Sequence, residues 1–180
     1  YIGLFNSAVI CDDPVVIIES QTLYQAVGLV PVDDLDYCIP FGKARIVRPG
    51  TACTIIACGN MVPLYLEAVE KSGVDAEVID PRTLDSVSMD WQTIGASVQR
   101  TNRLLVAEQT ARGPSLGARI VQEGQERLFD WLDHQILRVS GTQSAPVVSK
   151  ILEQAALADV DDVVAGIHAL MGDGAREAAE

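Results

Sequence analysis

Apolar and polar positions follow two spacings along most of the chain, and each change of spacing marks a predicted element. Short uninterrupted apolar runs are typical of strands covered on both faces, and a three- or four-residue apolar spacing is typical of helices. The runs predict strands over 54–59, 76–81, 103–109 and 136–141. The helical stretches predict helices over 61–73, 88–100, 115–132, 145–157 and 159–172.

Strands that alternate with helices are typical of βαβ units, so we expect an α/β fold with a doubly wound, mostly parallel sheet. Gly73 is placed to end the first of these helices, and Ser88 is the expected N-cap of the second. Ahead of them, two β-rich runs flank Pro49-Gly50, a turn dipeptide. The simplest interpretation is an antiparallel hairpin at the edge of the sheet.

The start of the chain is organised differently. Ile2, Phe5 and Val9 follow helical spacing with no capping residue or initiator methionine before them, which favours a fragment whose amino-terminal part lies upstream. Residues 15–18 form an apolar run that predicts a strand covered on both faces. Residues 24–42 show neither spacing and carry two prolines and three aspartates, so we interpret them as an interdomain linker.

Charge narrows the classes of partner. The 180 residues carry 25 acidic and 13 basic side chains, for a net charge of −12. We therefore expect neither non-specific nucleic-acid binding nor binding to anionic membranes, and no apolar run approaches the roughly 18 residues of a membrane span. An acidic surface suits a basic protein partner, although solvation alone also explains it.

The side chains that bind zinc are too dispersed for a zinc site. None of the four cysteines forms a C-x-x-C pair, and the two histidines, His134 and His168, are far apart. We interpret the cysteines as small hydrophobic residues in a reducing compartment. They are Cys11, Cys38, Cys53 and Cys58.

The segment 104–120, "LLVAEQTARGPSLGARI", runs from a predicted strand through a glycine-bearing loop into a helix. Phosphates often bind at such junctions, but the segment matches neither the dinucleotide fingerprint nor the P-loop. It has no lysine, and Pro114 removes a backbone donor. We interpret it as a connection in which Gly117 allows close packing and Arg112 reaches a neighbouring subunit.

Polar residues follow every predicted parallel strand, and the carboxyl ends of such strands share one edge of the sheet. These residues can cap the following helices, or they can line a ligand crevice. Arg82 and Glu108 end two sequential strands, so we expect Arg82 to form an ion pair with Glu108 or with Asp80. The four groups are Gly59-Asn60, Asp80-Pro81-Arg82-Thr83, Glu108-Gln109 and Ser140-Gly141-Thr142.

Five stretches occur in an order that resembles a known family. They are "SAVICDDPVVIIESQTLY", "IPFGKARIVRPGT", "AEVIDPRTLDSVSMDWQTIGASVQRTNRLLVAEQ", "LDHQILRVSG" and "DVDDVVAGI". Together they resemble the carboxy-terminal part of the beta subunit of thiamin-diphosphate-dependent 2-oxo acid dehydrogenases, which includes the transketolase C-terminal domain. The group comprises the pyruvate, branched-chain 2-oxo acid and acetoin dehydrogenases.

The resemblance implies a division of the chain. Residues 1–30 are expected to end a pyrimidine-binding domain, 31–42 to form the linker, 43–172 to form the transketolase C-terminal-like domain, and 173–180 to form a polar tail. Thiamin diphosphate and magnesium would bind outside this chain, so no catalytic residue is assigned and the chain alone is expected to be inactive. The implied location is the cytoplasm, or the mitochondrial matrix of a eukaryote.

The resemblance also implies partners and two candidate sites. Expected partners are an alpha subunit, a second copy of this chain and the binding domain of an acyltransferase core. Main-chain carbonyls of Ala8, Val9, Cys11 and Asp13 match a structural potassium site. The acidic cluster Asp159, Asp161 and Asp162 could dock the acyltransferase core, or it could only cap the final helix. The alternative function is a stand-alone α/β domain that binds a small molecule in the strand-end crevice.

Overall fold

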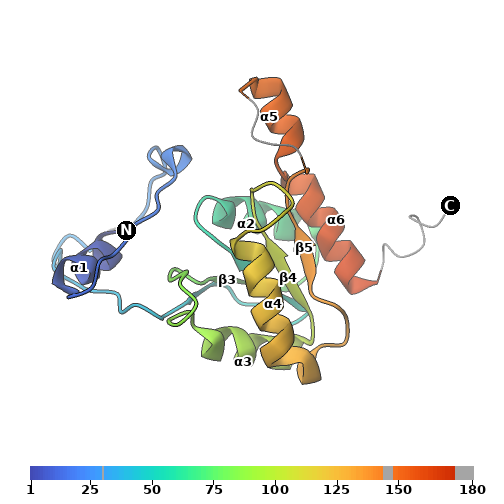
Figure 1. Cartoon of the computed structure of the whole chain (residues 1–180), viewed down its shortest axis with the longest axis horizontal. Helices are drawn as coiled ribbons and strands as arrows, with labels where there is room; N and C mark the ends of the chain where they lie inside the picture. The colour runs from blue at the N-terminus through green and yellow to red at the C-terminus, as the bar shows by residue number, and fades with distance from the viewer. Residues whose placement is uncertain (30, 144–147, 173–180) are drawn as a thin grey trace.

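A five-stranded sheet organises the chain from residue 45 onward (Figure 1). The computed structural model describes residues 1–29, 31–143 and 148–172. The strands lie in the order β1-β3-β2-β4-β5, and all neighbouring pairs are parallel except β1 with β3. The expected doubly wound, mostly parallel sheet with an antiparallel edge is therefore confirmed. The strands are β1 (Arg45–Arg48), β2 (Cys53–Ala57), β3 (Ala76–Asp80), β4 (Leu104–Ala107) and β5 (Leu137–Val139).

Helices cover both faces of the sheet, and each face has its own apolar core. On one face α2 (Met61–Ser72) and α6 (Val160–Met171) pack over side chains that include Ile55 of β2. On the other face α3 (Trp91–Thr101) and α4 (Leu116–Leu128) pack over side chains that include Ile56. Adjacent residues of a strand point to opposite faces, so the uninterrupted apolar runs supply both cores at once.

The antiparallel edge strand does not form the predicted hairpin with its neighbour in sequence. β1 pairs with β3, because residues 49–52 cross the start of β3 and carry the chain to the far side of it. The backbone N–H groups of Thr51 and Ala52 both donate to the Asp75 carbonyl. A Cβ atom on Gly50 would lie 2.3 Å from the Ala76 carbonyl carbon, so glycine permits this crossing.

The helix ends partly match the expectations. Gly73 ends α2 in the left-handed conformation with φ of 69°, as expected. The N-cap of α3 is Asp90 rather than Ser88, because Asp90 directly precedes the helix and its Oδ1 accepts from Thr93 N–H. The Asp90 Oδ2 also accepts from the backbone N–H of Ala44 at 3.0 Å. One carboxylate therefore fixes both the start of α3 and the entry into β1.

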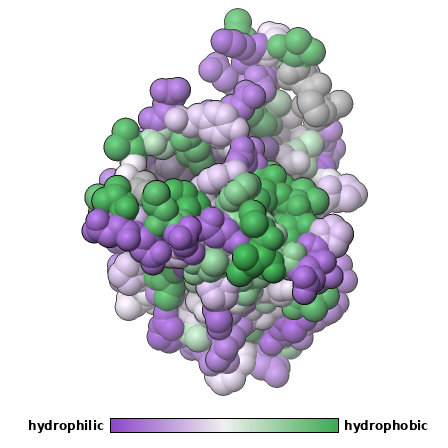
Figure 2. All heavy atoms as spheres, turned by 90° about the vertical axis from the view of Figure 1, so that its left-hand side faces the viewer, coloured by the Kyte–Doolittle hydropathy of each residue, from purple (hydrophilic) through white to green (hydrophobic). Residues whose placement is uncertain are grey.

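The first 29 residues contain α1 (Ile2–Ile10) and the short 3-10 helix η1 (Gln21–Leu23). The strand expected at 15–18 does not form, because no described backbone group forms a hydrogen-bond ladder with it. Its apolar side chains are consequently open to solvent, with Val16 86% and Ile18 78% exposed. Figure 2 views the molecule from this side and shows hydrophobic side chains gathered on its surface.

The carboxy-terminal elements are shorter than the sequence predicts. α4 ends at Leu128 and is followed by the 3-10 helix η2 (Phe129–Trp131), and α5 (Lys150–Ala156) projects from the body in Figure 1. Residues 145–147 of the helix expected at 145–157 and the expected polar tail at 173–180 fall outside the described residues. Within the described ranges, no helix has the length and apolar character needed to cross a bilayer.

Candidate functional site

The carboxyl edge of the sheet gathers polar side chains, and Glu108 is the most connected of them. Its Oε1 accepts from the Ser115 hydroxyl at 2.6 Å, and its Oε2 accepts from the Gly117 N–H at 2.8 Å. The Arg138 Nε lies 2.9 Å from Oε1, and the two side chains are only 20% and 12% exposed for Arg138 and Glu108. One carboxylate thus links the end of β4, the start of α4 and strand β5.

The contacts of Glu108 show whether the segment 104–120 could bind a phosphate. The amino terminus of α4 has the N–H groups and the dipole that attract an anion, but the chain's own Glu108 fills that position. A Cβ atom on Gly117 would lie 2.5 Å from the Glu108 Cδ, so glycine is needed for the carboxylate to approach. The segment is therefore a packed connection and not a phosphate site.

The expected ion pair between Arg82 and Glu108 is wrong. Glu108 pairs with Arg138, because β5 lies beside β4, whereas β2 separates β4 from β3 and the Arg82 that follows it. Asp80 is not an ion-pair partner either; its Oδ1 accepts from the Arg82 backbone N–H at 3.0 Å. In the described ranges the Arg82 guanidinium has no hydrogen bond or ion pair.

The other strand ends serve largely to hold connections together. Asn60 Nδ2 donates to Gln109 Oε1 at 2.9 Å, which joins the ends of β2 and β4. The Gly141 N–H donates to the Thr110 carbonyl, and a Cβ atom on Gly141 would lie 2.4 Å from the Ala156 carbonyl oxygen. This supports the capping and connecting roles that the sequence allows for these residues.

Burial holds the Cys58 thiol and the Tyr65 phenol near this edge in their protonated forms. Burial raises the pKa of the Cys58 thiol to about 12, with a smaller contribution from Asp80 and Glu108. Burial likewise raises the pKa of the Tyr65 phenol, whose oxygen has no hydrogen-bond partner among the described atoms. Burial also raises the pKa of Asp80, although its hydrogen bond from the Arg82 N–H opposes the shift. Cys58 and Tyr65 therefore supply no activated nucleophile at neutral pH.

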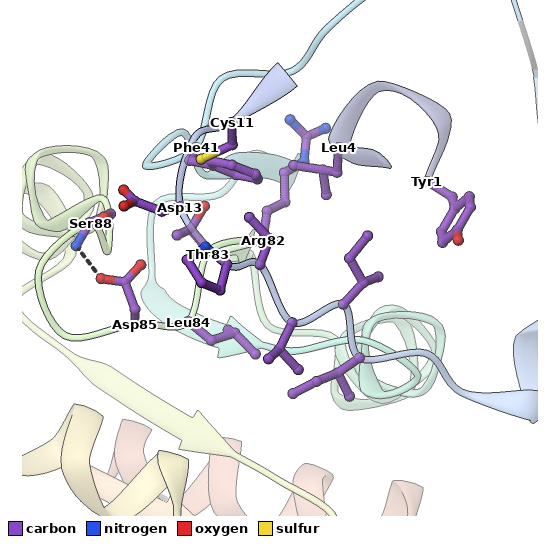
Figure 3. A pocket seen from close by; sticks show the side chains of 15 residues that line it. Tyr1, Leu4, Cys11, Asp13, Phe41, Arg82, Thr83, Leu84, Asp85 and Ser88 are labelled. Atoms are coloured by element: carbon purple, nitrogen blue, oxygen red, sulfur yellow. Dashed lines mark hydrogen bonds between the residues drawn. The ribbon is translucent and has the colours of Figure 1, made fainter. Parts of the chain in front are cut away.

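A hollow of ≈ 610 Å³ opens beside Arg82, between the amino-terminal residues and the connection from β3 to α3 (Figure 3). Its wall includes the apolar run 15–18, Phe41 and Leu84, and its polar residues include Arg82 and Asp85. The Asp85 carboxylate accepts from the backbone N–H groups of Val87 and Ser88. A second hollow of ≈ 650 Å³, lined in part by Arg112 and Arg138, lies between β5 and α6.

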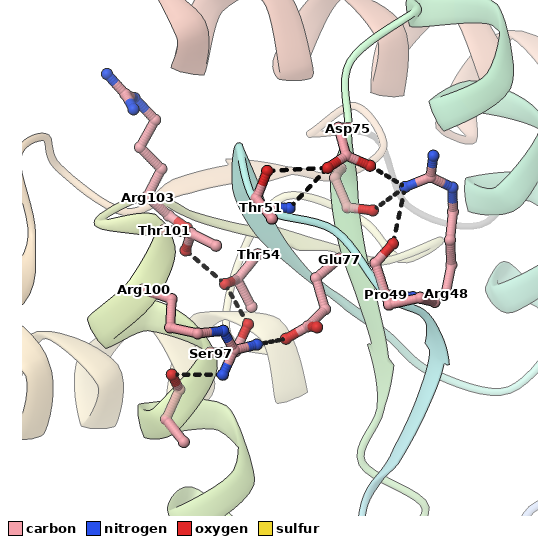
Figure 4. A network of polar contacts seen from close by, with 12 residues as sticks. Arg48, Pro49, Thr51, Thr54, Asp75, Glu77, Ser97, Arg100, Thr101 and Arg103 are labelled. Atoms are coloured by element: carbon pink, nitrogen blue, oxygen red, sulfur yellow. Dashed lines mark hydrogen bonds and ion pairs between the residues drawn. The ribbon is translucent and has the colours of Figure 1, made fainter.

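A polar network at the opposite, amino edge of the sheet is structural (Figure 4). The Thr54 hydroxyl is hydrogen-bonded to the Ser97 hydroxyl at 2.6 Å and to the Thr101 hydroxyl at 2.8 Å. Beside it, the buried Glu77 accepts from Arg100 at 2.6 Å. Thr54, Ser97, Thr101, Glu77 and Arg100 are paired with one another, so these contacts fix α3 on the sheet.

The two family-derived candidate sites lie at opposite ends of the chain. Ala8, Val9, Cys11 and Asp13 occupy the end of α1 and the turn after it, and Cys11 and Asp13 line the hollow beside Arg82. The described residues contain no group of three histidine, cysteine, aspartate or glutamate side chains placed to hold a metal. A potassium site built from main-chain carbonyls therefore stays a prediction.

The acidic cluster has defined local partners. Asp159 is the N-cap of α6, and with Asp162 it forms a capping box, in which each side chain accepts from the other's backbone N–H. Asp161 is paired with Lys71 of α2 and stays 73% exposed. The capping role is confirmed. His134 is exposed, whereas His168 packs with its Nε2 3.2 Å from the Ser72 carbonyl oxygen.

Comparison with known proteins identifies the fold family. The model of "Transketolase, C-terminal domain" matches residues 42–163, which include all five strands. The chain belongs to the transketolase C-terminal domain family. A solved chain described as "Split gene transketolase, inactive beta4 tetramer" has the same fold, with a TM-score of 0.59 and 24% identity over 81% of this chain and 46% of that one.

The matched transketolase C-terminal domain sits within a longer similarity to beta subunits. The chain is 36% identical to the pyruvate dehydrogenase E1 component subunit beta-2 of Oryza sativa subsp. japonica, over 90% of this chain and 44% of the relative. It is 37% identical to the corresponding beta subunit of Homo sapiens, over 92% and 47%. It is 35% identical to the beta subunit of acetoin:2,6-dichlorophenolindophenol oxidoreductase of Bacillus subtilis, over 95% and 50%. The chain spans about half the length of these relatives.

The sequence shows the strand-end residues of this transketolase C-terminal domain but not their partners. Glu108, Gly117 and Arg138 were each visible as separate features, and the interaction that joins them depends on β4 and β5 being neighbours. A usable signal was present in the acidic residue that ends β4, followed by Ser115 at the N-cap and Gly117 in the first helical turn. That order is typical of a carboxylate that caps the next helix.

Proposed function

We propose that this chain is the carboxy-terminal half of the beta subunit of a thiamin-diphosphate-dependent 2-oxo acid dehydrogenase. The parent enzyme would decarboxylate a 2-oxo acid oxidatively and transfer the acyl group to a lipoyl carrier, in the cytoplasm or the mitochondrial matrix. The similarity to pyruvate and acetoin enzyme subunits over at least 90% of the chain is the observation that carries this proposal. The chain's own role would be subunit assembly and docking.

The described residues do not fit a site for thiamin diphosphate and magnesium. Glu108 fills the amino terminus of α4, and the described ranges hold no cluster of three metal-binding side chains. We therefore derive no catalytic step for this chain. In the proposal, the cofactor and magnesium bind outside residues 1–180, and the potassium site at Ala8 to Asp13 supports the interface between the two halves.

Exposed apolar side chains support the assembly role. In the first 35 residues many large hydrophobic side chains are more than half exposed, although such residues usually lie inside a fold or an interface. The proposed occupants of this surface are the preceding part of the beta subunit, an alpha subunit or a second copy of the chain. The side chains are Tyr1, Val9, Ile10, Val16, Ile18, Tyr24, Val27, Leu29, Val32 and Leu35.

Light scattering on charge-carrying variants tests the assembly role. We expect the chain to self-associate at micromolar concentration, and we expect Val16→Asp combined with Ile18→Asp to convert it to a monomer. Val87→Asp is the matched control, because Val87 is 92% exposed but lies in the connection between β3 and α3. A monomeric wild-type chain, or equal dissociation in all variants, would contradict a specific apolar interface.

We propose that the acidic cluster at the start of α6 docks a basic partner, the binding domain of the acyltransferase core. The chain's net charge is −12, and Asp161 is exposed beyond its ion pair with Lys71. Complementary charge raises association rates, and salt reduces the effect. The capping roles of Asp159 and Asp162 are compatible with docking, because their outer carboxylate surfaces remain exposed.

The docking test compares two charge reversals of equal size. Asp161→Lys with Asp162→Lys is expected to slow association with the core and to flatten its dependence on ionic strength. Asp33→Lys with Asp34→Lys changes the net charge equally at another exposed acidic pair and controls for overall charge. Circular dichroism checks that α6 persists without its capping partner. Equal slowing by both reversals would leave the cluster as a helix cap only.

A second candidate function is binding of a small molecule by this domain. The specific observation in its favour is the hollow beside Arg82 and Thr83, which follow β3 at the carboxyl edge of the sheet. Small-molecule binding and the assembly role do not exclude each other. The hollow is lined by residues of this chain alone, so a ligand could bind there whether or not the chain is assembled.

A further inference from the structure

Arg82 has a backbone conformation that side chains rarely adopt. Its φ is 57°, in the left-handed region, where a non-glycine residue is strained and persists only when its surroundings fix it. Asp80 fixes it from one side by accepting the Arg82 N–H. From the other side, the Thr83 hydroxyl accepts from the Gly42 N–H at 2.9 Å. The Arg82 side chain lines the hollow, and backbone strain of this kind is concentrated at functional sites.

Arg82 is half-buried, and its guanidinium has no hydrogen bond or ion pair with any described residue. Figure 3 shows the side chain passing through the hollow toward Leu4 and Phe41. Arginine is rarely withdrawn from water without an acceptor, because it offers five N–H donors. The position therefore suits a ligand that supplies oxygen acceptors.

The rest of the hollow sets the character of that ligand. Its volume of ≈ 610 Å³ falls within the range of small-molecule sites, and apolar side chains form most of its wall. All four residues of the run 15–18 line the hollow, and Val15 and Ile17 are the less exposed of them, at 39% each. Leu84 and Phe41 complete the apolar wall. A short hydrocarbon chain would be desolvated there.

The surrounding charges select the anion. Asp13 and Asp85 also line the hollow, and the Asp80 carboxylate accepts from the Arg82 backbone N–H. A dianionic phosphate would be repelled by these carboxylates, and a neutral ligand would leave the guanidinium unpaired. A single carboxylate matches the planar fork of one arginine and adds only one negative charge.

We propose that the hollow binds a small aliphatic monocarboxylate, whose carboxylate pairs with Arg82 and whose carbon chain packs against Phe41, Leu84 and the run 15–18. This site lies on the present chain and does not depend on the proposed role in a dehydrogenase. It is also separate from the carboxylate of Glu108, which Arg138 and the start of α4 already satisfy.

Titration of the 180-residue chain with four probes tests the site. Isovalerate combines the carboxylate and the carbon chain, acetate retains only the carboxylate, 3-methylbutan-1-ol retains only the carbon chain, and inorganic phosphate supplies a dianion. Isovalerate should bind with a dissociation constant on the order of 1 mM, measured by calorimetry and NMR. Acetate, the alcohol and phosphate should each bind at least about tenfold more weakly.

Substitutions test which residues bind isovalerate. Arg82→Met should weaken isovalerate binding at least about tenfold, because charge-assisted hydrogen bonds are lost. Arg112→Met is the control for loss of an arginine charge, since Arg112 lines the other hollow. Leu84→Ala should weaken isovalerate but not acetate. If Arg82→Met fails to fold, Arg82→Lys decides, because it keeps the charge and loses the fork.

Four results would overturn the proposal. They are the absence of saturable isovalerate binding, equal binding by Arg82→Met or by folded Arg82→Lys, equal affinity for 3-methylbutan-1-ol, and tighter binding of phosphate. Failure of this test leaves the assembly results unaffected, because the oligomeric state is measured without any ligand.

Discussion

The carboxylate of Glu108 lies at the amino terminus of α4 and accepts a 2.8 Å hydrogen bond from the backbone N–H of Gly117. In α/β proteins this position often receives a bound anion, and here the chain supplies the anion itself. The same carboxylate is paired with Arg138 of β5. The Glu108 side chain therefore connects the end of β4 with the start of α4 and with β5.

Gly117→Ala should destabilise the domain by about 1–3 kcal/mol, because the added Cβ forces the Glu108 carboxylate away from its hydrogen-bond donors. Urea unfolding measures the change. Gly113→Ala is the control, since a Cβ atom there would meet nothing within 4 Å. Equal unfolding midpoints for the two variants would contradict the close packing of Gly117 and Glu108.

Glu108→Gln should cost about 2 kcal/mol, because it leaves the largely buried Arg138 guanidinium without its counter-charge. The exposed pair of Lys71 with Asp161 supplies the comparison: Asp161→Asn should cost less than about 1 kcal/mol. Unfolding in low and high salt separates the two pairs, because screening affects the exposed one more. If Asp161→Asn lowered the free energy of unfolding more than Glu108→Gln does, the buried pair would not be the stronger of the two.

Ionised Asp90 should stabilise the folded domain, and this contribution should be lost in acid. Burial alone would raise its pKa, but hydrogen bonds from the Ala44 and Thr93 N–H groups and the Thr93 hydroxyl outweigh burial and lower it. A lowered folded-state pKa gives stability that is present above the unfolded value of about 3.9 and is lost as pH falls through the folded value. Asp90→Ala should cost about 1–2 kcal/mol at pH 7 and less in acid. An equal cost at both pH values would exclude this linkage.

The strand and helix pattern was predictable from the sequence because it depends on local periodicity. The uninterrupted apolar run 54–57 predicts a strand with two covered faces, and β2 is buried throughout its length. Local signals failed where pairing depends on distant residues. Pro49-Gly50 has the composition of a hairpin turn, yet Gly50 packs on the Ala76 backbone and the chain crosses β3. The strand expected at 15–18 has no neighbour to pair with in the described residues.

In the candidate site, too, the features that depend on residues distant in the sequence could not be predicted. The strand-end residues were identified as a group, because parallel strands bring their carboxyl ends to one edge. The partner of Glu108 was missed, because sequential strands are not neighbours in this sheet: β2 lies between β3 and β4. The hollow beside Arg82 had no sequence signal, since it depends on the left-handed backbone of Arg82 and on the position of the run 15–18.

Cysteine alkylation should follow exposure and thiol pKa. Burial raises the pKa of Cys53 to about 11 and that of Cys58 to about 12, so both carry less thiolate near pH 8 than an unperturbed cysteine. Iodoacetamide should therefore modify the exposed Cys38 first. Peptide mass spectrometry over time, with a urea-unfolded sample as the control, gives the order. Equal rates for Cys38 and Cys58 in the folded chain would contradict this environment for Cys58.

The central claim is that this chain assembles and docks subunits of a thiamin-dependent 2-oxo acid dehydrogenase while the catalytic centre lies outside it. The most direct test is carbon dioxide release from several 2-oxo acids by the purified 180-residue chain, with thiamin diphosphate and magnesium present. We predict a rate no greater than that of the cofactor mixture without protein. Saturable, thiamin-dependent release of carbon dioxide by the chain alone would contradict the claim.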